Sequence, residues 1–149
     1  MKLTAKGRYA VMAVADIAAQ GSKAIVSLPD IAARQSISLS FLEQLFAKLR
    51  RAEIVSSVRG PEGGYTLMQS PADIRLNTVI AAVDEDIKAH ACNPETKLTC
   101  TGKSNRCLTH NLWGALENHI EGFLASVTIE DVVEQRIPLD TEKKLEAAE

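Results

Sequence analysis

Apolar residues recur every three or four positions in several stretches of the chain, and this spacing predicts amphipathic helices. The first stretch covers residues 9–20 and ends at Gly21, a residue that commonly terminates helices. A second, short helix is predicted to begin at Ser27-Leu28-Pro29-Asp30, where a serine cap, an early proline and an acidic residue occur together. This helix is expected to end near Gln35.

A third helix is predicted after the tight connection at residues 36–38, and it should extend to about Ala52. Its buried face is expected to carry the four apolar residues Leu42, Leu45, Phe46 and Leu49. Two helices joined by a short turn form a helix-turn-helix. Strands at 54–58 and 65–68 flank the glycine-rich turn 59–64 and predict a hairpin. The expected fold is mainly α, a winged helix-turn-helix with a two-stranded wing.

The second half of the chain has a different pattern. A short helix is predicted over residues 76–83, but residues 84–106 are polar and show no periodicity. From Leu108 a broad apolar stripe predicts a long helix, followed by a short helix that begins near Thr128. The stripe is too apolar for a solitary surface helix, so we expect it to pair with its twin in a homodimer.

These patterns divide the chain into four regions. Residues 1–83 are expected to form the DNA-binding region, 84–107 a ligand-binding loop, 108–136 a dimerisation helix with the short helix after it, and 137–149 a polar, disordered tail. A chain of 149 residues that is 46% hydrophobic and 24% charged is typical of one globular domain.

Charge is distributed unevenly along the chain. The formal net charge is −2, but residues 1–75 carry ten Lys and Arg against six Asp and Glu, whereas residues 76–149 carry seven against thirteen. A basic first half is suited to phosphates. The N-terminus is basic, but Asp16 interrupts the apolar stretch after it, and no apolar run approaches the ~18 residues of a membrane span. We therefore expect a cytoplasmic protein with no membrane partner.

The third helix and the hairpin carry the residues expected to contact double-stranded DNA. Ser40 and Gln44 lie where the second helix of a helix-turn-helix contacts base edges. Phosphate contacts are expected from the basic residues near the end of this helix, Lys48, Arg50 and Arg51. Arg59 at the hairpin turn is placed to enter the minor groove. The alternative is purely structural: Ser40 and Glu43 also fit a capping box, and basic residues favour helix C-termini.

Three cysteines and a histidine form a second candidate site. Cys92, Cys100, Cys107 and His110 follow the spacing C-x7-C-x6-C-x2-H, which provides four ligands for a metal ion or an iron–sulfur cluster. Cys107 and His110 are expected on one face of the long helix. The spacing alone does not choose between iron–sulfur and structural zinc, and the cysteines could also be reduced and buried. His90 and His119 are expected to have no ligand role. No nucleophile with an orienting group is found, so we do not expect an enzyme.

Several motifs resemble the Rrf2 family of bacterial transcription regulators. They are residues 1–10 (MKLTAKGRYA), 38–46 (SLSFLEQLF) and 58–65 (VRGPEGGY). The run Cys107-Leu108-Thr109-His110, together with the two earlier cysteines, narrows the resemblance to the iron–sulfur cluster regulators within this family. The resemblance covers the chain to about residue 136.

The resemblance implies a homodimeric repressor and activator with one [2Fe-2S] cluster per subunit, held by Cys92, Cys100, Cys107 and His110. Such a protein would bind pseudo-palindromic operators, control cluster assembly genes and receive its cluster from the iron–sulfur assembly machinery. Glu43 corresponds to the residue with which the family discriminates between promoter classes. We hypothesise that cluster binding repositions the third helix so that Glu43 is tolerated at one class of site.

Overall fold

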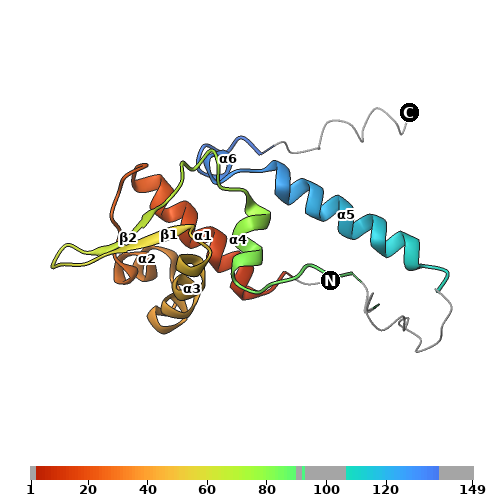
Figure 1. Ribbon diagram of the computed structural model, residues 1–149, viewed down its shortest axis with the longest axis horizontal. Coiled ribbons are helices and arrows are strands. Elements are labelled where there is room, and N and C mark those ends of the chain that lie inside the picture. Colours follow the sequence, from red (N-terminus) through yellow and green to blue (C-terminus); the bar gives the residue numbers. More distant parts are fainter. Residues whose placement is uncertain (1–2, 90–91, 93–106, 138–149) are drawn as a thin grey trace.

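The computed structural model describes residues 3–89, 92 and 107–137, which form a mainly helical fold with one two-stranded antiparallel sheet (Figure 1). The elements in chain order are α1 (Ala5–Gln20), α2 (Leu28–Gln35), α3 (Leu39–Arg51), β1 (Val55–Val58), β2 (Gly64–Leu67), α4 (Leu76–Ala82), α5 (His110–Ser126) and α6 (Ile129–Val133). The expected order of elements is confirmed. The predicted tail from residue 138 onward lies outside the described residues.

The connection between α2 and α3 explains where the third helix begins. Ser36 ends α2 in the left-handed conformation, with φ of 54°. The Ser38 hydroxyl then accepts a hydrogen bond from the backbone N–H of Phe41 at 3.3 Å, which makes Ser38 the N-cap of α3. The capping box considered for Ser40 and Glu43 is therefore wrong, because Ser40 already lies inside the helix.

The core joins the helix-turn-helix to the hairpin and to the end of the chain. The four predicted apolar residues of α3 are all buried, and Phe46 packs against Tyr65 of β2 with ring centroids 4.8 Å apart. Ile129 of α6 is fully buried in the same cluster. The short last helix thus folds back onto the core that contains α1 and α3.

The hairpin is attached to the body of the molecule through its second strand. β1 and β2 pair in antiparallel register, with Val58 opposite Gly64. Tyr65 and Val26 also exchange two backbone hydrogen bonds, of 2.8 and 2.9 Å. Gly64 permits this approach, because a Cβ at that position would lie 2.3 Å from the Val26 carbonyl oxygen. The wing therefore projects from a fixed base beside α3.

Helix α5 extends away from the body formed by the other helices (Figure 1). It begins at His110, two residues later than expected, and none of its residues is buried. At its C-terminal end the chain returns to the core, where the backbone N–H of Ile129 donates to Ile74 O at 2.9 Å. Among the described residues, no helix has the length and apolar character needed to cross a membrane.

Candidate DNA interface and cysteine–histidine site

The N-terminal half of α3 presents the predicted base-reading residues to solvent. Ser40, Glu43 and Gln44 are all exposed, whereas Leu42 and Leu45 face the core. The apolar face thus holds the helix against the protein and leaves the polar face free, which is the arrangement in which a recognition helix enters the major groove. Leu39, at the first position of the helix, is 41% exposed on this surface.

The basic residues near the end of α3 have different environments. Arg50 and Arg51 are exposed. Lys48 is partly buried, and its ammonium lies 2.7 Å from a carboxylate oxygen of Asp84, a residue just beyond α4. Its predicted phosphate contact stays a prediction, but in this structure the ammonium already has an anionic partner. Sequence analysis missed Asp84, which is distant in the chain and belongs to a stretch without periodicity.

Arg59 lies in the turn of the hairpin, and its side chain is exposed. The following residue, Gly60, has a φ of 125°, a backbone conformation that residues other than glycine rarely adopt. This glycine allows the chain to turn tightly between the two strands. The turn therefore places a guanidinium at the tip of the wing, as the minor-groove prediction requires.

A short connecting segment, residues 84–89, runs from α4 towards Cys92 and contacts three helices. The Glu85 carboxylate is buried and accepts hydrogen bonds from the backbone N–H groups of Thr4 and Gly7 at the start of α1. The Thr4 side chain makes no cap, and the first turn of α1 contains no acidic residue. Glu85 therefore caps α1 from a distance. No signal in the sequence pointed to this partner, because Thr4 is itself a residue type that commonly caps helices and only the structure shows that its side chain makes no cap.

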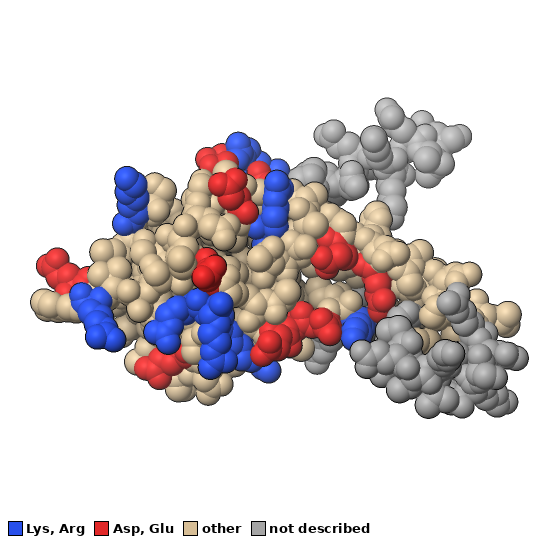
Figure 2. Space-filling view, viewed as in Figure 1, with Lys and Arg blue, Asp and Glu red and all other residues tan. Residues whose placement is uncertain are grey.

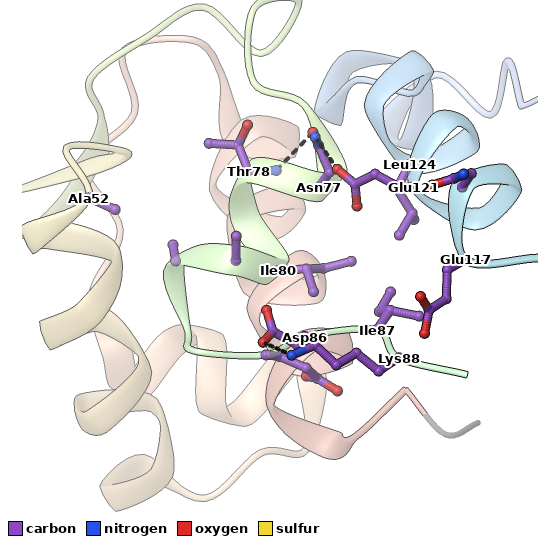
Figure 3. Close-up of a pocket in the computed structure, with 14 residues that line it drawn as sticks. Ala52, Asn77, Thr78, Ile80, Asp86, Ile87, Lys88, Glu117, Glu121 and Leu124 are labelled. Carbon is purple, nitrogen blue, oxygen red and sulfur yellow. Dashed lines mark hydrogen bonds and ion pairs between the residues drawn. The ribbon is translucent and has the colours of Figure 1, made fainter. Parts of the chain in front are cut away.

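The connecting segment also meets α5. The backbone N–H of Ala89 donates to the Glu117 carboxylate, and the side-chain amide of Asn77 in α4 donates to Glu121 at 2.9 Å. Between these contacts lies a cavity of 620 Å³, lined by α4, the connecting segment and α5 (Figure 3). Polar contacts on both sides of this cavity thus set the position of α5 relative to the body.

Two of the four predicted ligands lie together at the start of α5. The Cys92 sulfur is 3.4 Å from Nδ1 of His110. Cys107 precedes the helix, and its carbonyl accepts a hydrogen bond of 3.1 Å from the His110 backbone N–H. The expectation that Cys107 and His110 share a face of the long helix is wrong, because Cys107 belongs to the turn before it. Its sulfur lies 3.7 Å from the Thr109 hydroxyl.

The fourth predicted ligand is Cys100, and the two histidines expected to have no ligand role are His90 and His119. Cys100 and His90 lie outside the described residues. Within the part of the chain that the structure describes, no three Cys, His, Asp or Glu side chains are grouped closely enough to hold a metal ion. His119 is exposed on α5, away from the Cys92–His110 pair in the chain. The donors that are present, a thiol and an imidazole in contact, suit zinc or iron.

Charge over the visible face of the molecule is mixed. Figure 2 shows basic side chains gathered over the lower left part of the molecule, where Figure 1 has α2 and α3, and acidic side chains towards α5. This separation follows the positive first half and negative second half of the chain. A phosphate backbone would therefore meet the face around α3 more favourably than the α5 side.

Comparison with known proteins places the chain among transcription regulators. The family model Rrf2, described as an iron-dependent transcriptional regulator, matches residues 3–135. The chain is 50% identical over 140 residues to the HTH-type transcriptional regulator IscR of Vibrio atlanticus (strain LGP32), a match that covers 94% of this chain and 79% of the relative. It is 52% identical over 133 residues to IscR of Vibrio vulnificus (strain YJ016), covering 89% and 77%.

Solved structures agree with this placement. The T. potens IscR structure superposes with a TM-score of 0.74 at 34% identity, covering 91% of this chain and 88% of that chain. CymR (YrzC), the global cysteine regulator of B. subtilis, superposes with a TM-score of 0.76 at 27% identity, covering 91% and 98%. The mainly helical winged fold is thereby confirmed. These relatives are regulators of transcription, not enzymes.

Proposed function

The chain belongs to the Rrf2 family of iron-dependent transcriptional regulators, and on this premise we propose that it senses the supply of iron–sulfur clusters. It is a DNA-binding transcription regulator by its relatives. The proposed additions are one [2Fe-2S] cluster per subunit and control of the genes for cluster assembly, with the assembly machinery as cluster donor. The proposed ligands are Cys92, Cys100, Cys107 and His110.

The observation that carries this proposal is the contact between Cys92 and His110. These residues are 18 positions apart in the chain, and their sulfur and Nδ1 atoms lie 3.4 Å from each other. In the turn before α5, the hydrogen bond from the His110 backbone N–H to the Cys107 carbonyl keeps the backbones of these two residues close together. Two cysteine sulfurs and an imidazole near the start of one helix are donors that iron accepts.

Each ligand would have a separate structural task. Cys92 lies three positions beyond the connecting segment, residues 84–89, which contacts α1, α3 and α5, whereas His110 is the first residue of α5. Ligands on both would tie that segment to the helix. The cluster, when bound, supplies a redox-active and labile inorganic centre. The neutral imidazole in place of a fourth thiolate leaves the site less negative, which favours a more loosely held cluster.

A structural zinc site is the second candidate, because the same donors suit zinc. The metal content and visible absorption of anaerobically purified protein distinguish the two candidate functions. Iron–sulfur ligation predicts visible absorption, with iron and acid-labile sulfide in equal amounts. A colourless protein loaded with zinc would support the second candidate and contradict the first.

His110 provides a sharper test of the ligand set. The His110→Ala variant is expected to lose iron and sulfide faster than the wild type during exposure to air. His119→Ala, an exposed histidine on the same helix, is the matched control and should retain the cluster like the wild type. Equal retention in all three proteins would argue against ligation by His110.

We also propose how the protein meets DNA. The exposed face of α3 enters the major groove, so that Ser40 and Gln44 contact bases, and Arg51 and Lys48 contact phosphates. Arg59 at the wing enters the minor groove. Glu43 lies on the same exposed face, where its carboxylate repels phosphate and is accepted only opposite suitable bases.

The proposed dimer uses helix α5. Leu112 is 58% exposed and Phe123 is 44% exposed, and no residue of this helix is buried. Leu112, Leu116 and Phe123 lie on one side of the helix at its repeat of 3.6 residues per turn. A second copy of the helix covers this side in the proposed dimer. Two wings related by a two-fold axis then bind a pseudo-palindromic operator.

A further inference from the structure

Asp84 occupies a special position between the two regions of the protein. It follows Val83, the C-cap of α4, has a φ of 57°, and its backbone N–H donates to Ala81 O at 3.1 Å. Its neighbour Glu85 is buried and hydrogen-bonded to the start of α1. The backbone at Asp84 is therefore held from both sides, and the carboxylate is directed by the fold towards α3.

On α3 this carboxylate meets Lys48. The Nζ to Oδ2 distance is 2.7 Å, and the two side chains are 31% and 77% exposed, respectively. The Lys48 side chain is mostly covered while Asp84 is open to solvent, so the ammonium is the more restricted partner. A partly exposed ion pair of this kind contributes little free energy, so a phosphate of DNA can replace the carboxylate as the partner of the ammonium.

The surroundings of Asp84 are basic. Lys48 lowers the pKa of the Asp84 carboxyl by a hydrogen bond and by its charge, and Lys6 and Arg51 lower it further. The carboxylate thus stays ionised in neutral solution. It sits among the same cations that would face a phosphate backbone when α3 lies in the major groove.

We propose that Asp84 is an internal competitor for Lys48, whose carboxylate holds the ammonium that would otherwise contact a DNA phosphate and so lowers the affinity for duplex DNA. This inference rests on the proposed placement of α3 in the major groove. Since Asp84 begins the segment that leads to Cys92, the competitor lies at the junction of the DNA-binding and ligand-binding regions. Binding then requires Lys48 to exchange one anionic partner for another.

The Asp84→Asn variant tests this inference with little disturbance of the backbone. Asparagine accepts a positive φ as readily as aspartate, so the local conformation is kept. Binding of a labelled duplex of mixed sequence to the full-length wild type and variants would be followed by fluorescence anisotropy. Asp84→Asn is expected to raise the affinity about two- to fivefold per subunit, the size expected for loss of a competing surface ion pair.

A double-mutant cycle with Lys48→Gln separates competition from general repulsion. If Asp84 acts through Lys48, the gain from Asp84→Asn disappears when Lys48 is absent. Lys48→Gln alone should also reduce the slope of log affinity against log salt by about 1 per subunit, because one phosphate contact is lost. The control Asp86→Asn removes an equal charge from the same segment, at a residue 3.3 Å from Lys88, and should change the affinity less.

Three results would overturn the inference. An equal gain from Asp84→Asn with and without Lys48, or a gain matched by Asp86→Asn, would mean that the carboxylate acts by its charge alone. A loss of affinity in Asp84→Asn would mean that it supports Lys48 instead of competing for it. All three results leave the proposed function intact, since the wild type still binds DNA. Failure of the wild type to bind any duplex would instead refute the placement of α3 in the groove.

Discussion

Helices α3 and α5 make opposite use of similar patterns. Both have apolar residues at helical spacing, yet α3 buries four of them in the core while α5 buries none. The difference shows that periodicity identifies a face that needs a partner but does not say where the partner is. For α3 the partner is the rest of the same chain. For α5 the residues that the structure describes leave much of this face exposed, although the helix also contacts α4, and the dimer proposal rests on that exposed side.

The largest expected effect comes from removing a large buried side chain from the core of the DNA-binding region, residues 1–83. Phe46 is fully buried and packs against Tyr65, so Phe46→Ala should lower the free energy of unfolding by about 3–5 kcal/mol. The loss should be similar at all protein concentrations, because the contacts lie within one chain. Urea denaturation followed by circular dichroism at two concentrations measures it. A loss below about 1 kcal/mol would contradict the packing described here.

The second prediction addresses α5. Phe123→Glu places a charge on the proposed dimer surface and should convert the protein to a monomer in sedimentation velocity experiments at micromolar concentration. Asn118→Glu is the matched control, since Asn118 is exposed on the opposite side of the helix from Leu116 and Phe123. The control should remain dimeric. A monomeric wild type, or a dimeric Phe123→Glu variant, would contradict the use of this surface.

The sequence predicted the first region well for a physical reason. Strong periodicity, local caps at Ser27 and the glycine-rich turn are signals contained within a few neighbouring residues, and the structure confirms the elements that they predict. The start of α3 after Ser38 was also predicted correctly, whereas the alternative capping box at Ser40 and Glu43 was wrong. Ser38 begins the helix because its hydroxyl accepts a hydrogen bond from the Phe41 backbone N–H.

Contacts of the connecting segment were not predictable in the same way. Glu85 caps α1 from 81 positions away from Thr4, and Asp84 meets Lys48 across the space between α4 and α3. Pairings of this kind depend on the final arrangement of helices, and no local pattern encodes them. The ligand set shows the same limit: spacing suggested four ligands, but it placed Cys107 on the helix instead of in the turn before it.

A third prediction concerns an ion pair that joins α1 to α2 within the first region. Asp16 is nearly inaccessible, and its carboxylate accepts hydrogen bonds of 2.7 Å from both Arg34 and Gln35. Burial raises the pKa of this carboxyl, but the hydrogen bonds and the charge of Arg34 outweigh burial, so the pKa lies below its usual value of 3.8. The ionised form therefore stabilises the fold.

The sign of the pH dependence follows from this lowered pKa. The stabilisation is fully present above the unfolded-state value near 3.8 and is lost as the pH falls through the lower folded-state pKa. Asp16→Asn should cost about 1–3 kcal/mol at neutral pH, and the difference from the wild type should shrink in acid. Thermal denaturation across this range measures both, with the exposed Asp73→Asn as control. A difference that does not depend on pH would contradict the assignment.

The smallest expected effect tests whether the ligand-binding region beside α5 influences DNA binding by α3. If the ligand-binding region acts on DNA reading through Glu43, then cluster-free Glu43→Ala should bind sites selected by the cluster-loaded wild type about tenfold more tightly than the cluster-free wild type does. Glu62→Ala at the hairpin turn removes an equal charge and should not reproduce this gain. Anisotropy titrations on duplexes selected from a random pool provide the measurement. If cluster-free Glu43→Ala discriminates as strongly as the cluster-free wild type, Glu43 is not the residue through which the two regions communicate.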